Sequence, residues 1–483
     1  MKQERLPPSQ PSEPCAPVPP APAPGPGPGP DGGTSSSDGR PSADAADASD
    51  GPPSAEGGRA DAPRGVRHSL RAFRHRDFTI FWGGALVSST GSWLSNLAVP
   101  YVLYEITGSA FWVGLVSLAQ FLPSVFLSPV GGTLADRRSR KRILLVTQSG
   151  MAVSALLLWL VWTSGQRDPV VMLVLVSLGG VFAGFNMPTW QSFVSDLVPR
   201  GDLHSAVTLN SLQFNTARSL GPALAGLLLA VLGPAWTFLL NAVSFLFVLA
   251  ALAAIHPRAG RPQQAAPAGM TRRFLAAPRY IRRQPGLVMA LVVSVLVGVL
   301  GHPIFQFTVV FAGSVFEAGP VGLGLLNAAL GLGAVVAAPL VSGWHHKLRL
   351  GLVVRWGLVL YGLSMIAFGA APGYAWGVAA LIVVGGSFLA VISSVNTSIQ
   401  VIVADGMRGR VMACRIMTYT ASLPVGGLLQ GVVADWAGPR WAVCGAGALM
   451  AVAAVTLMRL RGRARLDRLD DPHDDSHLVG SAS

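Results

Sequence analysis

The feature that most constrains this chain is a series of apolar stretches, each of about 20 residues, the length that a helix needs to cross a lipid bilayer. Hydrophobic residues make up 51% of the sequence and charged residues 12%, and the mean hydropathy is +0.50. Soluble domains carry about 25% charged residues. Since backbone groups in lipid must bond within their own segment, each stretch should be a helix. The sequence predicts an all-α membrane protein with twelve transmembrane helices, at 78–104, 111–135, 143–164, 169–189, 205–232, 235–255, 286–312, 320–343, 351–371, 374–400, 409–436 and 440–459.

Basic residues predict the orientation of these spans. They gather in the loop 137–142, in the long linker after the sixth span, and after the eighth, tenth and twelfth spans. The opposite loops hold only Arg167 and Arg440. Positive loops stay in the cytoplasm, so both termini are expected on the cytoplasmic side of a bacterial inner membrane. The net charge of +13 is spread over short loops rather than one basic face, which argues against a nucleic-acid partner.

The chain divides into five predicted parts. Residues 1–66 are rich in Pro, Gly, Ala and Ser and predict a disordered cytoplasmic tail, either a docking segment or a dispensable extension. Residues 67–257 and 286–460 are expected to form two six-helix bundles. Between them, 258–285 is a basic cytoplasmic linker, and 461–483 is a second cytoplasmic tail.

An internal repeat relates the two predicted bundles. Gln191 and Asp196 match Gln400 and Asp405 at the same spacing, and a proline follows each pair in the next span. Both stretches run from the fourth into the fifth span of their bundle. Two halves related by a parallel repeat are an architecture that transporters use.

Several motifs resemble those of one known family, the major facilitator superfamily. GGTLADRRSRKR is similar to its loop 2–3 signature, on which Gly132, Asp136, Arg137, Arg140 and Lys141 fall, with Ser139 in place of the usual glycine. The sequence Gly221-Pro222 followed by Gly226 resembles a motif frequent in helix 5 of the superfamily's exporters. FRHRDFTIFWGG, YEITGSAFWVG and NMPTWQSFVSDLVPRGDL resemble the branch that contains the enterobactin exporter and transmembrane secretion effectors.

The resemblance implies a carrier whose two halves rock around a central site. It implies that Asp136 latches the halves together in the outward-open state, against the start of helix 11 at 408–412. A carboxylate is favoured at a helix N-terminus. Arg140 is then expected to pair with Asp136, and Gly132 to let helices 2 and 11 approach. Pro222 removes one helix hydrogen bond and lets helix 5 bend.

No pattern in the sequence indicates an enzyme, a cofactor or a metal site. We find no Walker loop, no GxSxG and no HExxH. The three cysteines, Cys15, Cys414 and Cys444, have no metal-ligand spacing and form no disulfide framework. Direct use of ATP by this chain is therefore not expected.

Ionisable residues at membrane depth are few. The acids outside the tails lie at or near the predicted span ends, so the candidates are Arg218, His302, Arg415 and, close to a span end, Glu105. Arg218 contacts either an anionic substrate or a structural partner, because an unpaired arginine in a membrane is costly. His302 is either a proton carrier or a hydrogen-bonded structural residue.

The transport pathway is predicted from the resemblance, which implies that helices 1, 4, 7 and 10 line a central cavity. Each lone Asn or Ser there can instead be a helix–helix hydrogen bond. Together with aromatic residues they indicate a mostly apolar cavity with a few polar anchors, which suits amphipathic cargo. The predicted pathway residues are Trp93, Asn96, Tyr101, Asn186, Arg218, His302, Gln306, Ser393 and Asn396.

These observations favour a monomeric transporter that exports a hydrophobic or amphipathic small molecule, such as a drug, siderophore or natural product, across the lipid bilayer by alternating access, coupled to protons by antiport. Two alternatives remain. One is an importer or facilitative carrier of the same fold. The other, from a different class, is a membrane receptor or scaffold that displays the N-terminal tail.

Overall fold

A computed structural model describes residues 70–256, 270–344, 349–404, 407–459 and 469. All of them belong to one compact unit, Ala62–Ser483. The predicted tail 1–66 lies outside the described residues, and so does nearly all of 461–483.

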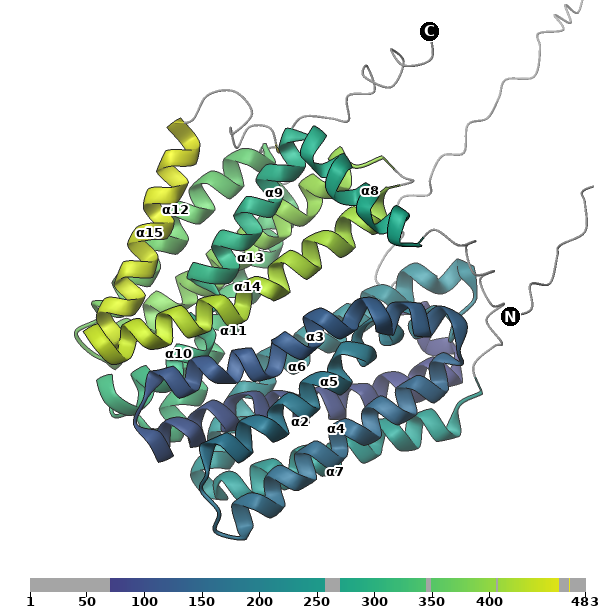
Figure 1. Cartoon of the computed structure of the whole chain (residues 1–483), viewed down its shortest axis with the longest axis horizontal. Helices are drawn as coiled ribbons and strands as arrows, with labels where there is room; N and C mark the ends of the chain where they lie inside the picture. The colour runs from purple at the N-terminus through teal and green to yellow at the C-terminus, as the bar shows by residue number, and fades with distance from the viewer. Residues whose placement is uncertain (1–69, 257–269, 345–348, 405–406, 460–468, 470–483) are drawn as a thin grey trace, which may run out of the picture. The chain divides into compact units, whose positions relative to one another are not determined.

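The described residues form helices throughout, and their bounds follow the predicted spans closely (Figure 1). The seventh span is interrupted, and a short helix, α8, lies in the predicted linker. The first half comprises α2 (Arg76–Thr107), α3 (Ala110–Arg137), α4 (Arg140–Thr163), α5 (Pro169–Val194), α6 (Leu203–Val231) and α7 (Gly233–Ala254). The second half comprises α8 (Met270–Arg283), α9 (Pro285–Leu296), α10 (Ile304–Val310), α11 (Gly319–Trp344), α12 (Leu350–Gly369), α13 (Tyr374–Ile402), α14 (Arg408–Ala437) and α15 (Pro439–Arg459).

The surface of the bundle is apolar in the way that a lipid environment demands. Ten helical segments among the described residues are long and apolar enough to cross a membrane, and α2 and α6 are as long but more polar. Phe126 and Val231 are about 70% exposed, which only lipid makes favourable. Trp376, Trp436 and Trp441 are also exposed, and all lie at helix ends on one side, as interfacial tryptophans do.

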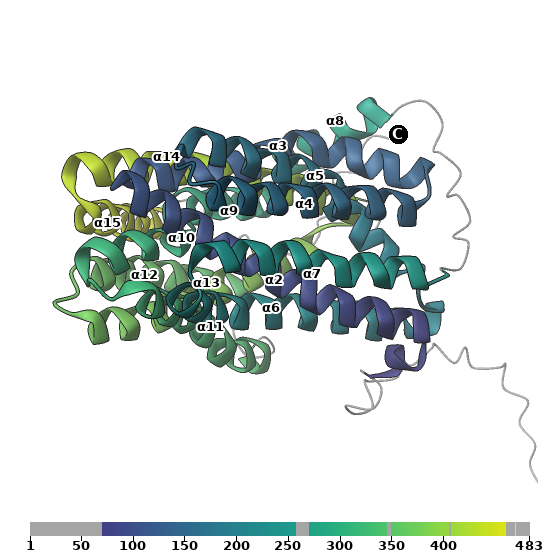
Figure 2. The same ribbon diagram turned by 90° about the horizontal axis from the view of Figure 1, so that it is seen from below.

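The helices run side by side, so the bundle has two ends (Figure 2). We call the end with the α3–α4 loop, Arg138–Ser139, the basic end. The other end holds the α2–α3 connection at Gly108–Ser109 and the α14–α15 connection at Gly438. We call it the distal end.

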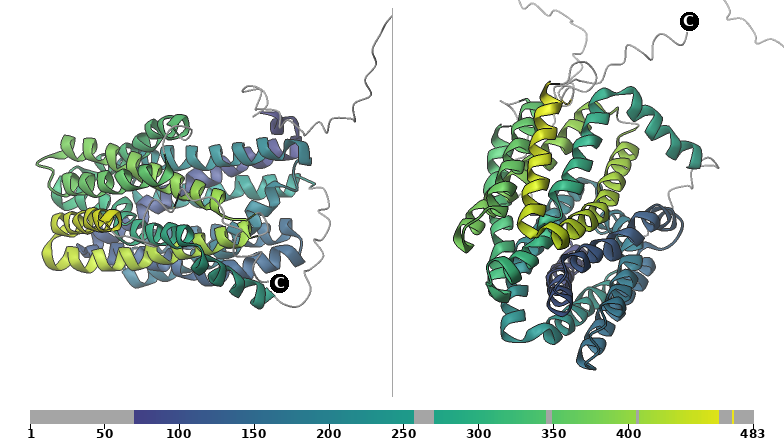
Figure 3. Two further views of the ribbon diagram at one scale, coloured as in Figure 1. Left: turned by 90° about the horizontal axis from the view of Figure 1, so that it is seen from above. Right: turned by 60° about the vertical axis from the view of Figure 1, so that its left-hand side comes forward.

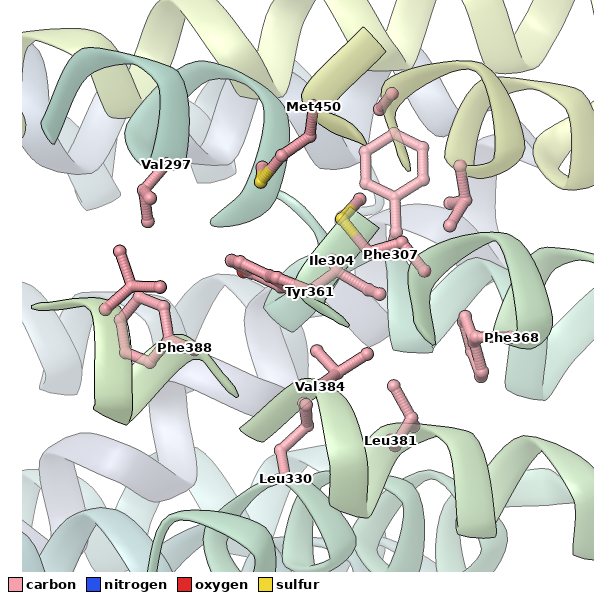
Figure 4. Packing of buried hydrophobic residues seen from close by; sticks show 14 of the residues in the cluster. Val297, Ile304, Phe307, Leu330, Tyr361, Phe368, Leu381, Val384, Phe388 and Met450 are labelled. Carbon is pink, nitrogen blue, oxygen red and sulfur yellow. The ribbon is translucent and has the colours of Figure 1, made fainter. Parts of the chain in front are cut away.

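The second half has a dense apolar interior (Figure 4). Tyr361 and Phe368 of α12, Phe307 of α10 and Met450 of α15 are fully buried in it. Phe388 of α13 belongs to the same cluster, and its ring also reaches the central cavity described below. This core therefore fixes one wall of the cavity.

The seventh span is broken at its centre. Two π-helical turns, Val297–Gly301 and Phe311–Val315, flank α10. The N–H of His302 bonds the carbonyl of Val297 at 2.7 Å, and Pro303, which has no N–H, follows. Such π turns are frequent at functional sites. Here the break places His302, Phe305 and Gln306 against the cavity.

The two halves meet along two helix pairs, α3 with α14 and α6 with α11 (Figures 1 and 3). Gly226 of α6 crosses Gly324 of α11 so closely that a Cβ on Gly226 would lie 2.5 Å from the Gly324 Cα. Both residues are near the distal ends of their helices. The structure is therefore closed between the halves at the distal end.

Candidate functional site

A cavity of about 360 Å³ lies between the two halves, in the size range of small-molecule sites. Its wall comes from α2, α3 and α6 of the first half and from the seventh span, α11 and α13 of the second. Because each half supplies one wall, movement of the halves would change the access to this cavity.

Six residues singled out from the sequence line the cavity. Four come from the first half and two from the broken seventh span, and they are Trp93, Asn96, Arg218, Pro222, His302 and Gln306. These six residues therefore lie together in the wall of one central cavity. Their roles in transport stay predictions.

Four other predicted pathway residues lie outside the cavity wall. The Asn186 side-chain oxygen accepts hydrogen bonds of 3.1 Å from Thr147 and from Gln148, both of α4. Asn396 accepts from Arg415 at 3.3 Å. Tyr101 packs against the apolar core, and the Ser393 carbonyl accepts a bond from the Thr397 hydroxyl. In this state Asn186 and Asn396 make hydrogen bonds between helices, which is the alternative to a pathway role that the sequence analysis named.

The sequence reasoning missed several wall residues. Gln120 of α3 donates to Asn96 at 2.7 Å, and Asn327 of α11 donates to Thr308 at 2.9 Å. The other wall residues that it missed include Asn215, Phe305 and Phe388. Gln120 and Asn327 are isolated amides in apolar spans, which is a usable signal, but their helices were not expected to face the cavity.

Arg218 is the only Arg or Lys side chain among the described residues of the wall. Its guanidinium carbon lies 5.3 Å from the Phe305 ring centroid, 5.4 Å from that of Phe388 and 5.9 Å from that of Trp93. Aromatic rings attract a cation at such distances. The ring of His302 lies 5.1 Å from that of Phe305. The cavity thus holds a cation surrounded by aromatic rings.

The helix 5 motif has two packing roles. A Cβ on Gly221 would lie 2.3 Å from the Trp93 Cβ, so the glycine seats Trp93 against α6. Gly226 forms the crossing with α11 described above. Pro222 lies between them and lines the cavity. The motif therefore joins the cavity wall to the distal contact of the halves.

In the loop motif the observed partner of Arg140 differs from the expected one. Arg140 Nη1 bonds Asp196 Oδ1 at 2.7 Å and the Ser192 carbonyl at 3.3 Å, which ties the start of α4 to the end of α5. The expected Arg140–Asp136 pair is therefore not formed in this state. Lys141 donates to the Ile255 carbonyl at 2.7 Å, beyond the end of α7.

Asp136 and Gly132 are free of the contacts expected for a closed latch. Asp136 is exposed and makes no hydrogen bond or ion pair within the described part of the chain, and neighbouring Arg137 is exposed as well. No heavy atom lies within 4 Å of a Cβ built on Gly132, whereas on Gly131 it would lie 2.9 Å from the Phe185 Cα. Packing in this state therefore needs Gly131, which lies outside the signature positions, and does not need Gly132, which is one of them.

Two carboxylates between α5 and α6 have shifted pKa values in opposite directions. Burial raises the pKa of Asp196, and the neighbouring Arg140 offsets this only in part. The hydrogen bond from His75, 2.8 Å long, lowers the pKa of Asp202. The two carboxylates therefore respond differently to acid, although both anchor the basic end of the first half.

At the distal end one carboxylate joins the halves. Asp435, near the end of α14, accepts hydrogen bonds from the N–H of Ala110 at 2.7 Å and of Phe111 at 3.2 Å. The hydroxyl of Ser109 also donates to it. These are the unpaired donors at the N-terminus of α3, so a residue of the second half caps a helix of the first.

The Asp435 carboxylate, near the end of α14, thus faces the start of α3. This is the geometry that the family resemblance implies for Asp136, which stands near the end of α3, at the basic end. The sequence profile of a family described as transmembrane secretion effector matches residues 68–477. The chain belongs to this family of the major facilitator superfamily.

Characterised relatives of the chain are transporters. The enterobactin exporter EntS of Citrobacter koseri is 27% identical over 414 residues, which cover 83% of this chain and 95% of that protein. The multidrug efflux pump Tap of Mycobacterium bovis is 26% identical over 408 residues, which cover 82% and 96%. As a member of this family, the chain is a multi-pass membrane transporter.

Solved structures show the same fold. A bacterial homolog of the human lysosomal transporter Spinster, in an inward-facing and unoccupied conformation, superposes with a TM-score of 0.64. The two are 13% identical, and the match covers 84% of this chain and 98% of the other. The predicted fold of twelve helices in two six-helix halves is confirmed.

Proposed function

We propose that this protein exports a hydrophobic or amphipathic small molecule by alternating access. The observation that carries the proposal is the central cavity, walled by both halves and shut at the distal end by the α6–α11 crossing and the Asp435 cap. The kinship with an enterobactin exporter and a multidrug efflux pump supports the outward direction. The basic loops support a cytoplasmic position of the basic end in a bacterial inner membrane.

Proton antiport is the coupling that we propose. The sequence has no nucleotide-binding loop, and the imidazole of His302 lies in the cavity wall. Imidazole is the side chain that ordinarily titrates near neutral pH. The variant His302→Gln tests whether His302 itself carries the proton. If it does, the substitution should flatten the pH dependence of transport between about pH 5.5 and 7.5.

Everted membrane vesicles provide the direct test. Vesicles containing the protein should accumulate amphipathic probes when their interior is made acidic, and a protonophore should abolish the accumulation. The probes are anilinonaphthalene sulfonate and phenylnaphthylamine, neither of which is a base that an acidic interior would trap. Accumulation in right-side-out vesicles instead would identify an importer.

Matched variants exclude indirect effects. Gly226→Val obstructs the crossing with α11 and should stop accumulation, whereas Gly445→Val should not, because no heavy atom lies within 4 Å of that position. Deletion of 1–66 should leave the flux intact. Loss of flux on this deletion would favour the scaffold alternative.

A further inference from the structure

The charges of the described residues are sorted by depth. The eight described carboxylates lie near or beyond the ends of the long helices, at Asp77, Glu105, Asp136, Asp168, Asp196, Asp202, Glu317 and Asp435. Arg218, in contrast, lies near the middle of α6, and Arg415 lies two turns inside α14. The described interior between the helix ends therefore carries cations without a carboxylate to balance them.

Arg218 has aromatic neighbours in place of a counter-ion. The Trp93, Phe305 and Phe388 rings surround its guanidinium group at 5.3 to 5.9 Å. A cation–π contact lowers the cost of a buried cation, but it satisfies no N–H donor, and a bidentate carboxylate, sulfonate or phosphate would satisfy two. The amides of Asn96, Gln120 and Gln306 in the same wall are neutral.

Arg415 of α14 is a second cation in the interior of the bundle. Arg415 is 8% exposed, its Nη1 bonds Asn396 at 3.3 Å, and its Nε has no hydrogen-bond partner within the described residues. The Tyr419 side chain lies within electrostatic range of both arginines. The Tyr361 hydroxyl, in range of Arg218, is buried without a described partner. Tyr419 therefore links the wall cation Arg218 to a second interior cation, Arg415.

We propose that the exported cargo carries an anionic group that pairs with Arg218, on an aromatic or apolar scaffold that packs against Trp93, Phe305 and Phe388. The inference rests on the proposed export function and names its substrate class. Cargo of this kind neutralises the cavity, while a cationic molecule of the same shape meets repulsion from Arg218 and Arg415. Because the cation is held by rings rather than by a carboxylate, cargo need not displace an internal ion pair.

Equilibrium dialysis of the full-length protein in lipid nanodiscs tests this, with empty nanodiscs as the baseline. The probes are naphthalene-1-sulfonate and naphthalene-1-sulfonamide, which share a ring system and differ in charge. Wild type should bind the sulfonate at least tenfold more tightly. Arg218→Gln should remove that preference, Arg218→Lys should keep part of it, and Arg142→Gln, which removes one positive charge from an exposed position outside the cavity, should keep all of it.

Equal binding of the two probes by wild type would overturn the anion site, as would a sulfonate preference that survives Arg218→Gln. If Arg218→Gln does not fold, the wild-type preference and its reduction in Arg218→Lys decide the question. The vesicle experiment separates this inference from the export function. A sulfonate preference without accumulation of any probe would contradict export and support the anion site. Accumulation without the sulfonate preference would support export and contradict the anion site.

Discussion

The Asp435 carboxylate of α14 accepts a 2.7 Å hydrogen bond from the N–H of Ala110, the first residue of α3, across the boundary between the two halves. Ser109, which stands at the N-cap position, donates its own hydroxyl to Asp435 and caps nothing itself. In the distally closed state the start of α3 is therefore satisfied by a residue of the second half.

Removing this cap should open the distal end. Asp435→Ala removes an N-cap contact of about 1 kcal/mol, which changes the ratio of closed to open carriers about fivefold. Spin labels at positions 107 and 437 should then show a larger population of long distances. Asp168→Ala is the matched control, because Asp168 caps α5 within the first half, through a 2.8 Å bond from Val170. It should lower the melting temperature and leave the 107–437 distances unchanged. An unaltered distribution in Asp435→Ala would remove its role in closure.

Asp136→Asn should act in the opposite sense. In the distally closed state Asp136 has no described partner, so the substitution costs this state nothing. If Asp136 caps α14 in the distally open state, its loss disfavours that state by about 0.3–1 kcal/mol and slows transport. Spin labels at 133 and 410 would report fewer short distances at the basic end. Arg138→Gln, off the motif, should match wild type. Identical distances and flux in the two variants would reduce the loop to a topology signal.

Adjacent glycines should differ in their tolerance of alanine. A Cβ on Gly131 would lie 2.9 Å from the Phe185 Cα and 3.1 Å from the Gly184 carbonyl oxygen. We expect Gly131→Ala to destabilise the protein by about 1–3 kcal/mol, as overpacking does. Gly132→Ala meets no atom within 4 Å and should be neutral or stabilising by up to about 1 kcal/mol. Thermal unfolding of the two variants in one detergent makes the comparison, and equal melting temperatures would contradict it.

Asp202 and Asp196 should give opposite pH dependences of stability. The pKa of Asp202 is lowered from 3.8 in the folded protein, so its contribution is present above about pH 4 and is lost as the pH falls through the lowered value. The pKa of Asp196 is raised from 3.8, so its ionisation costs stability as the pH rises through that range. The difference in melting temperature, wild type minus Asp202→Asn, should therefore increase with pH. The difference wild type minus Asp196→Asn should decrease with pH. Slopes of the same sign would contradict the assignment.

The sequence by itself determined the number, position and helical nature of the spans. The reason is that the length and hydropathy of a segment are local properties, and they decide whether it crosses a bilayer as a helix. Of the nine pathway residues predicted with the help of the family resemblance, five line the central cavity, and their roles in transport stay predictions.

The partners of these residues were decided only by the tertiary structure. Arg140 bonds Asp196 rather than Asp136, and Asp435 caps a helix more than 300 positions away in the sequence. The physical reason is that such contacts depend on where helices cross and how the halves are tilted, and these crossings are set by packing, as at Gly226 and Gly324. Gln120 and Asn327 enter the cavity wall for the same reason, because the rotation of a helix about its axis follows from its neighbours and not from its own composition.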